Sequence, residues 1–203
     1  MRKQQEVLKD MKEIINWYAL KVFYNKALHF KDLIEKDGIE TYIAMTTEVS
    51  RGKGRIQYQK KPVVSSLMFI KSTEEYLKSL RENHIAELTY YKTVNYKSKT
   101  GYSSVEFVPA VIPEDQMEVF KQATSEGNGI RYLGDVKELN LKPGDRVKVT
   151  EGPFKGREGY LKRIKKDRKF VIAIGNIAAF TIEGITYKMV EKVEINQNST
   201  SNN

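Results

Sequence analysis

The residues whose type and spacing could do chemistry in this 203-residue sequence lie in one short basic stretch. Arg51–Lys61 contains no acid and five cations, namely Arg51, Lys53, Arg55, Lys60 and Lys61. Cations on such a loop suit contacts with phosphate groups, which give an affinity independent of base sequence and sensitive to salt. The formal net charge of +9 also favours a polyanionic partner. The alternative is that the stretch is a plain solvated surface.

Catalysis finds little support in the same sequence. The only histidines, His29 and His84, are far apart, and neither a nucleophile signature nor a phosphate-cradling G-x-x-x-x-G-K pattern occurs. The absence of cysteine excludes thiol nucleophiles, Fe–S clusters, disulfides and cysteine-ligated zinc. We therefore expect a protein that is not an enzyme and that needs no cofactor and no metal.

The chain carries no sign of a membrane segment. Its longest uncharged run, Phe170–Ile182, is shorter than the ~20 residues of a spanning helix, and the charged N-terminus does not resemble a signal peptide. We expect a cytoplasmic protein that makes no membrane contact.

Strand and helix signals alternate over residues 14–125. Trp17–Phe23 is typical of a buried strand, and Ala27–Lys36 places its apolar residues on one helical face ahead of Gly38. Pro113 stands where prolines open helices. Further strands are predicted over Ile39–Met45, Val63–Ile70, Ile85–Tyr91 and Ser103–Val108, and a further helix over Thr73–Arg81. The pattern predicts an α+β domain in which helices cover an antiparallel sheet.

The remaining residues divide into a linker, a second domain and a tail. Residues 126–137 contain Gly127, Asn128 and Gly129, which favour a flexible linker. Residues 138–195 hold about five short strand signals, which favour a small closed barrel. Residues 196–203 have no apolar side chain, and we expect a disordered tail.

The second domain contains a turn rich in glycine, Glu151–Gly159. Gly152, Gly156 and Gly159 allow backbone conformations that a β-carbon would resist, and Phe154 is expected to anchor the turn. Together with the preceding strand, this stretch resembles the KOW motif.

The first domain is similar to the NGN domain of the NusG/Spt5 family. The similarity rests on Trp17–Leu20 opening a strand, a helix ending before Gly38, and a helix after Val111–Pro113. With the KOW motif, it covers about residues 15 to 195. The resemblance implies an NGN α/β sandwich over residues 14–125 and an SH3-like KOW barrel over residues 138–195.

The same resemblance implies a function in transcription. Family members bind RNA polymerase through an apolar concavity that grips the clamp helices of the β′ subunit, and they suppress pausing or termination. The matching positions are Tyr42, Met45, Val64 and Leu67. The Pro-Gly pair usual in this strand is replaced here by Ser65-Ser66.

Nucleic-acid contacts are implied at two places. The hairpin with Arg51, Lys53 and Arg55 matches one that lies toward the upstream DNA in the family. Specialised relatives read exposed non-template DNA around the first helix, where Lys26 and His29 are the matching candidates.

The KOW barrel implies a further partner. General family members present an apolar tip to the Rho termination factor or to a ribosomal protein, and Ile177 and Phe180 occupy the matching turn. The aromatic residue expected near Ile177 is absent.

Three functions remain open at this point. The departures from the family pattern favour a specialised bacterial paralogue, an antiterminator of the UpxY/RfaH type that serves selected operons such as surface-polysaccharide loci. The alternatives are a general housekeeping elongation factor of the NusG type and a ribosome-associated KOW protein that binds RNA.

Overall fold

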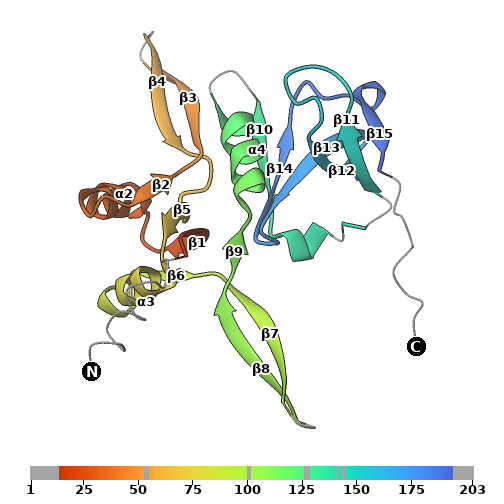
Figure 1. The fold of residues 1–203 in the computed structure, drawn as a ribbon. Coiled ribbons are helices and arrows are strands. Elements are labelled where there is room, and N and C mark those ends of the chain that lie inside the picture. Colours follow the sequence, from red (N-terminus) through yellow and green to blue (C-terminus); the bar gives the residue numbers. More distant parts are fainter. Residues whose placement is uncertain are drawn as a thin grey trace, which may run out of the picture. The chain divides into compact units, whose positions relative to one another are not determined.

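The computed structural model describes residues 14–52, 55–99, 102–125, 129–139, 141–142 and 145–193. It divides into two compact units, residues 1–114 and 115–203 (Figure 1). This division falls at the start of the last helix, whereas the sequence predicted domains over 14–125 and 138–195. Those domain boundaries stay a prediction, and each unit is described by itself.

Unit 1 is built on an antiparallel sheet with the order β2-β5-β1-β6. The central strand β1 pairs on one side with β5, for example through Ala19 and Phe69, and on the other with β6 and β9. The strands are β1 (Asn16–Val22), β2 (Glu40–Tyr42), β5 (Leu67–Ser72), β6 (Leu88–Tyr90) and β9 (Val111–Ile112).

Two helices, α2 (Ala27–Lys36) and α3 (Glu74–Asn83), contribute to the main core of unit 1. Because side chains alternate along a strand, β1 and β5 point one set of apolar residues toward this core. It contains Tyr18, Leu20, Val22, Met68 and Ile70 from the strands and Phe30, Ile34 and Leu77 from the helices. The expected strand, helix and antiparallel pattern of an α+β domain is confirmed.

The helix ends follow the sequence signals. Thr73 caps α3, because its hydroxyl oxygen accepts a hydrogen bond of 3.2 Å from the backbone N–H of Tyr76. Gly38, just after α2, has a φ of +76°, a left-handed conformation that glycine adopts without steric cost.

The opposite face of the sheet is also buried, and it carries Trp17, Ala19, Leu67 and Phe69. The Trp17 indole N–H donates to the Glu114 carboxylate at 3.1 Å, and the Lys71 ammonium lies 2.9 Å from the other oxygen of that carboxylate. These contacts attach the first residue of helix α4 (Glu114–Thr124) to the sheet.

Two long hairpins leave this sheet from opposite edges. One consists of β3 (Met45–Gly52) and β4 (Arg55–Pro62) and follows the edge strand β2. The other consists of β7 (Lys92–Lys99) and β8 (Tyr102–Pro109) and follows β6. Figure 1 shows the two hairpins projecting away from the sheet in opposite directions. Strand β7 was not predicted, because its alternating polar residues resemble a loop.

Unit 2 contains a six-stranded antiparallel sheet with the order β10-β14-β13-β12-β11-β15. Four of the five predicted strands are present, whereas the stretch expected to form the last is mostly a 3-10 helix, η3 (Tyr187–Met189). The strands are β10 (Ile130–Gly134), β11 (Arg146–Val149), β12 (Glu158–Ile164), β13 (Asp167–Ile174), β14 (Ala178–Ile182) and β15 (Val190–Lys192). A second 3-10 turn, η1 (Val136–Leu139), follows β10.

Strand β10 lies within the predicted flexible linker, and this part of the prediction is wrong. Ile130 pairs with Ile182 and Tyr132 with Phe180, so the segment completes one edge of the sheet. The Gly-Asn-Gly sequence just before the strand favours a linker, and the apolar run that could have indicated a strand is short, with only Ile130, Tyr132 and Leu133.

The glycines of the KOW turn have two different functions. Gly152 and Gly156 have φ values of +78° and +84°, as the tight turn requires. At Gly159, by contrast, an added β-carbon would lie only 2.5 Å from the Phe170 ring and 2.7 Å from the Val171 carbonyl oxygen. The turn therefore needs glycine twice for its backbone conformation and once for close packing, which corrects the expectation that all three serve the backbone.

Candidate functional site

The basic hairpin predicted from the sequence is the β3–β4 hairpin. Arg55 is exposed on β4, whereas Lys53 and the side chain of Arg51 lie outside the described residues. Lys61 forms an ion pair of 2.6 Å with Glu48, an acid just before the predicted stretch. The hairpin keeps a strong positive charge, since residues 45–62 hold five cations and one acid, a net of 5 − 1 = +4.

One face of this hairpin combines apolar and basic side chains. Val49 pairs with Tyr58, and the neighbouring pair on that face is Thr47 with Lys60. Ile56 and Tyr58 are exposed, the Tyr58 side chain to 72%. An exposed aromatic ring among cations can stack on an unpaired base while the cations contact phosphate. The sequence reasoning counted the cations and missed these residues, although their alternation along β4 was a usable signal.

The four predicted polymerase-binding residues lie near the place where this hairpin leaves the sheet. The Val63 N–H donates to the Ala44 carbonyl at 2.8 Å, which brings Met45 and Val64 close together. Tyr42 pairs with Phe69 on β5 and shares a sheet face with Leu67. Tyr42, Met45 and Val64 are half-buried and keep part of their surface accessible.

Leu67 differs from the other three because only 5% of it is exposed. It opens β5, where its N–H donates to the Val64 carbonyl at 3.2 Å. Its side chain belongs to the buried face of the sheet, so a polar substitution there would test folding before it tested binding.

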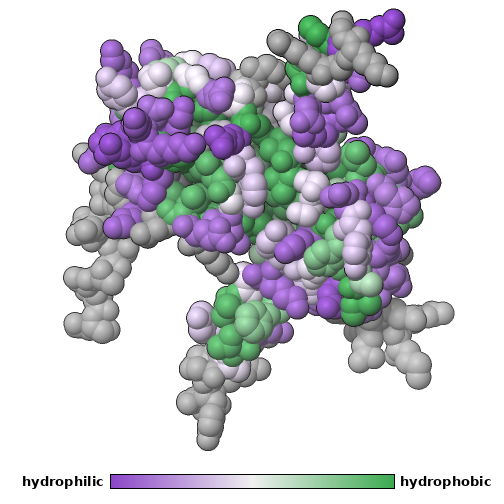
Figure 2. Space-filling view, turned by 180° about the vertical axis from the view of Figure 1, so that it is seen from behind, coloured by the Kyte–Doolittle hydropathy of each residue, from purple (hydrophilic) through white to green (hydrophobic). Residues whose placement is uncertain are grey.

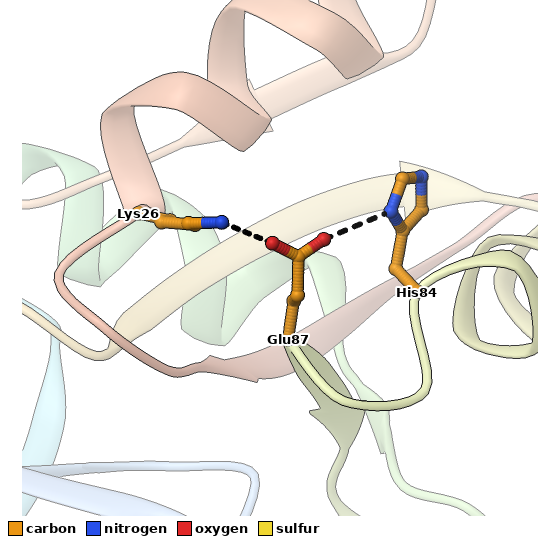
Figure 3. A network of polar contacts seen from close by, with 3 residues as sticks. All are labelled: Lys26, His84 and Glu87. Atoms are coloured by element: carbon orange, nitrogen blue, oxygen red, sulfur yellow. Dashed lines mark hydrogen bonds and ion pairs between the residues drawn. The ribbon is translucent and has the colours of Figure 1, made fainter.

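The structure places the predicted DNA-reading residue Lys26 in a polar network with Glu87 and His84 (Figure 3). Glu87 accepts from the Lys26 ammonium, and its other oxygen lies 3.3 Å from Nδ1 of His84. The Lys26 hydrogen bond, followed by that from His84, lowers the pKa of the Glu87 carboxyl. The ammonium of Lys26 therefore pairs with a carboxylate of the same chain.

His29, the other residue predicted to read DNA, stays exposed on α2. Its ring makes an edge contact with Phe30, with 5.6 Å between the centroids. The described structure does not bring His29 into the network of Lys26, so the two candidates do not form one joint site.

The predicted partner-binding residues of unit 2, Ile177 and Phe180, are buried. Phe180 is only 1% exposed, and its ring lies 4.7 Å from Phe120 of α4 and 5.4 Å from Tyr132 of β10. Gln116 of the same helix accepts a hydrogen bond of 2.9 Å from the Gly175 N–H. The expected exposed apolar tip is therefore not present at these residues, because both are buried, Phe180 against α4 and β10.

The turn that joins β12 and β13 and the start of β13 carry several basic residues and line a shallow groove of about 810 Å³. Lys166, Arg168 and Lys169 lie there beside Asp167 and Glu183, so both signs of charge are present. This mixture gives the groove little preference for a polyanion.

The described residues contain no group of three or more His, Asp or Glu side chains that could hold a metal ion. Within the part of the chain that the structure describes, we also find no helix that is long and apolar enough to cross a membrane.

Comparison with known families agrees with this two-unit architecture. The family model described as "Transcription termination factor nusG" matches residues 15–121, and the KOW motif model matches residues 143–173. No curated protein matches the chain significantly. The first match covers more than half of the 203 residues, from the opening strand into α4, and the second covers the glycine turn with its flanking strands. The chain therefore belongs to the NusG family of transcription elongation and antitermination factors, with an NGN domain followed by a KOW domain.

Proposed function

We propose that this chain binds RNA polymerase through unit 1 and suppresses pausing or termination on selected operons, such as surface-polysaccharide loci. One observation carries the proposal. The half-buried apolar residues Tyr42, Met45 and Val64 lie at the base of the basic β3–β4 hairpin. A surface for protein therefore adjoins a surface for phosphate. A polymerase that holds DNA presents both to a factor bound at its cleft.

The hairpin supplies the nucleic-acid part of the proposal. Arg55 is an exposed cation at the projecting end of β4, and Lys60 is an exposed cation nearer the base of the hairpin. Contacts of this kind with upstream or non-template DNA are independent of base sequence and supply affinity. The exposed Tyr58 ring can add affinity by stacking on an unpaired base, a contact that tolerates any base, so the choice of operon needs a further element.

The contact with polymerase is tested by the double variant Tyr42→Ser/Val64→Asp. A carboxylate at a desolvated protein interface costs affinity, so we expect about a 100-fold weaker complex with purified RNA polymerase. Single-round transcription on a template with a strong pause should lose the shortening of pause lifetime that the wild type gives. Leu28→Asp, which changes an exposed aliphatic residue on α2, is the matched control. A folded double variant that still binds polymerase like the wild type would contradict the proposal.

Selectivity for operons is tested by genome-wide crosslinking of the tagged protein beside RNA polymerase. Occupancy confined to a few operons supports the specialised antiterminator. Occupancy that follows polymerase over most genes would identify a general elongation factor instead. Co-sedimentation with ribosomes without polymerase occupancy would favour the RNA-binding KOW protein.

A further inference from the structure

The β7–β8 hairpin carries an apolar face that none of the functions above uses. Val94 pairs with Phe107 and Tyr96 with Val105, and cross-strand partners point to the same side of a hairpin. All four side chains are exposed, Tyr96 to 77% and Phe107 to 67%. Figure 2 shows hydrophobic residues gathered on this hairpin.

The opposite face of the same hairpin is polar. Asn95 pairs with Glu106 there, and Thr93 is exposed one pair closer to the sheet. Apolar side chains therefore predominate on one face of the hairpin, with the half-buried Val108 as the apolar residue on the polar face and Lys92 as the cation at the base of the apolar face. Aromatic rings that stack on bases need cations beside them to hold the phosphates. The four residues of the apolar face include no cation, and Lys92, one pair nearer the sheet on the same side, has its ammonium 5.4 Å from the centroid of the Tyr90 ring. The outer part of this face therefore fits protein better than nucleic acid.

The size of the patch limits which protein can cover it. Two aromatic side chains of about 150–250 Å² each, exposed as described, and two valines give a patch on the order of 400 Å². Patches of this size on a monomer are commonly functional. Two copies meeting through it would bury on the order of 800 Å², less than the ~1,200 Å² of a stable interface. The patch therefore suits a partner that the chain also holds elsewhere.

The net charge of the hairpin indicates which charges its partner carries around the contact. Residues 92–109 contain three lysines and one acid, a net of 3 − 1 = +2. A basic hairpin is steered toward a surface with carboxylates around an apolar centre.

We infer that the apolar face of the β7–β8 hairpin is a second, separate contact of unit 1 with RNA polymerase, on an apolar surface bordered by acidic residues. This inference rests on the proposed binding of polymerase by Tyr42, Met45 and Val64. The two contacts leave the sheet at opposite edges, so unit 1 is held at two points and resists rotation on its partner.

The experiment compares the wild type with Tyr96→Ser/Phe107→Ser in binding to purified core RNA polymerase. We expect the variant to bind about 10- to 100-fold more weakly, because exposed aromatic anchors dominate such interfaces. Thr93→Ser/Asn95→Ser, on the polar face of the same strand, is the matched control and should bind like the wild type. Val94→Thr/Val105→Thr keeps the β-branched shape that favours strands and should lose affinity to a smaller extent. If circular dichroism shows that Tyr96→Ser/Phe107→Ser does not fold, the affinity of Val94→Thr/Val105→Thr for polymerase decides whether the hairpin is a contact.

The outcomes separate this inference from the proposed function. If both apolar variants bind polymerase normally while Tyr42→Ser/Val64→Asp does not, the hairpin contact is wrong and the proposed function stands. If the wild type itself fails to bind polymerase, both fall. If the apolar variants instead lose binding to a labelled single-stranded oligonucleotide, or change from dimer to monomer in light scattering with polymerase affinity unchanged, the partner is nucleic acid or a second copy and the inference is overturned.

Discussion

The two hairpins of unit 1 have the same backbone plan and different surfaces. Both consist of two eight-residue strands that leave an edge of one sheet, and both expose aromatic and aliphatic side chains. On β3–β4, Lys60 lies on the same face as Tyr58, in the neighbouring pair. On β7–β8, the described cation of the aromatic face is Lys92 at the base of the hairpin, where its ammonium lies 5.4 Å from the centroid of the Tyr90 ring. The net charges are +4 and +2. The comparison teaches that the position of charge relative to the rings, more than its amount, selects between nucleic acid and protein.

The largest expected effect removes the support that both hairpins share. Trp17 is buried in the sheet and donates to Glu114, so Trp17→Ala should lower the free energy of unfolding by about 3–5 kcal/mol. Binding through both hairpins should then weaken. Urea denaturation measures the loss. Trp17→Phe is the control, which keeps most of the packing and lacks the indole N–H; an unchanged denaturation midpoint in Trp17→Ala would refute the shared support.

The next effect separates the hairpins by charge. Arg55→Glu/Lys60→Glu should weaken binding to duplex DNA about 30- to 100-fold at low salt and lower the slope of log affinity against log salt by about 2. The same reversal on the other hairpin, Lys97→Glu/Lys99→Glu, should leave DNA binding within about twofold. Fluorescence anisotropy over a salt series checks both. Equal losses in the two variants would remove the distinction between the hairpins.

A smaller effect separates them by aromatic stacking. Tyr58→Ala should weaken binding to a single-stranded oligonucleotide about 5- to 30-fold, or about 1–2 kcal/mol, the lower part of the range of about 1–3 kcal/mol that stacking contributes per base. Tyr58→Phe keeps the ring and should bind normally. Tyr96 lies two pairs away from Lys92, the described cation on its face, so Tyr96→Ala should bind the oligonucleotide like the wild type. A loss with Tyr96→Ala comparable to that with Tyr58→Ala would contradict the assignment.

The smallest effect concerns the turn that leads into β6 and the second hairpin. The Lys26 ammonium, with His84, lowers the pKa of Glu87, so the ionised carboxylate contributes its full stabilisation above the unfolded pKa of about 4.3. This contribution is lost as the pH falls from there through the lower pKa of the folded state. Glu87→Gln should therefore melt slightly below the wild type at pH 7 and by a smaller margin at pH 4. Thermal scans at both pH values check this. A gap that widens in acid would reverse the assigned sign.

Elements with local signals could be predicted from the sequence. Helix α3 starts at the residue after Thr73, the predicted cap, and α2 ends just before Gly38. The KOW turn was found from its glycines, two of which have positive φ. In each case the deciding residues lie within a few positions of one another, so the sequence pattern contains the cause.

The features that depend on distant partners could not be predicted in the same way. Strand β7 exists because β8 pairs with it across a turn, and its own polar residues do not mark a strand. Phe180 is buried by Phe120 and Tyr132, 60 and 48 positions away, and Lys26 meets Glu87 across 61 positions. A basic residue and an apolar tip look accessible in a sequence until such partners are known.

The short edge strands of unit 1 also affect how the protein avoids aggregation. In the described part of the sheet, β2 and β6 at the two edges have three residues each, and β9 beside β6 has two. A long, flat edge would present unpaired backbone groups to the edges of neighbouring molecules. Here the chain turns out of the plane into a hairpin soon after each edge begins. The central sheet therefore offers only short stretches to which strands of another molecule could add. The longer edges belong to the hairpins, whose described strands pair only with each other, and there the net charges of +4 and +2 oppose pairing with a second copy.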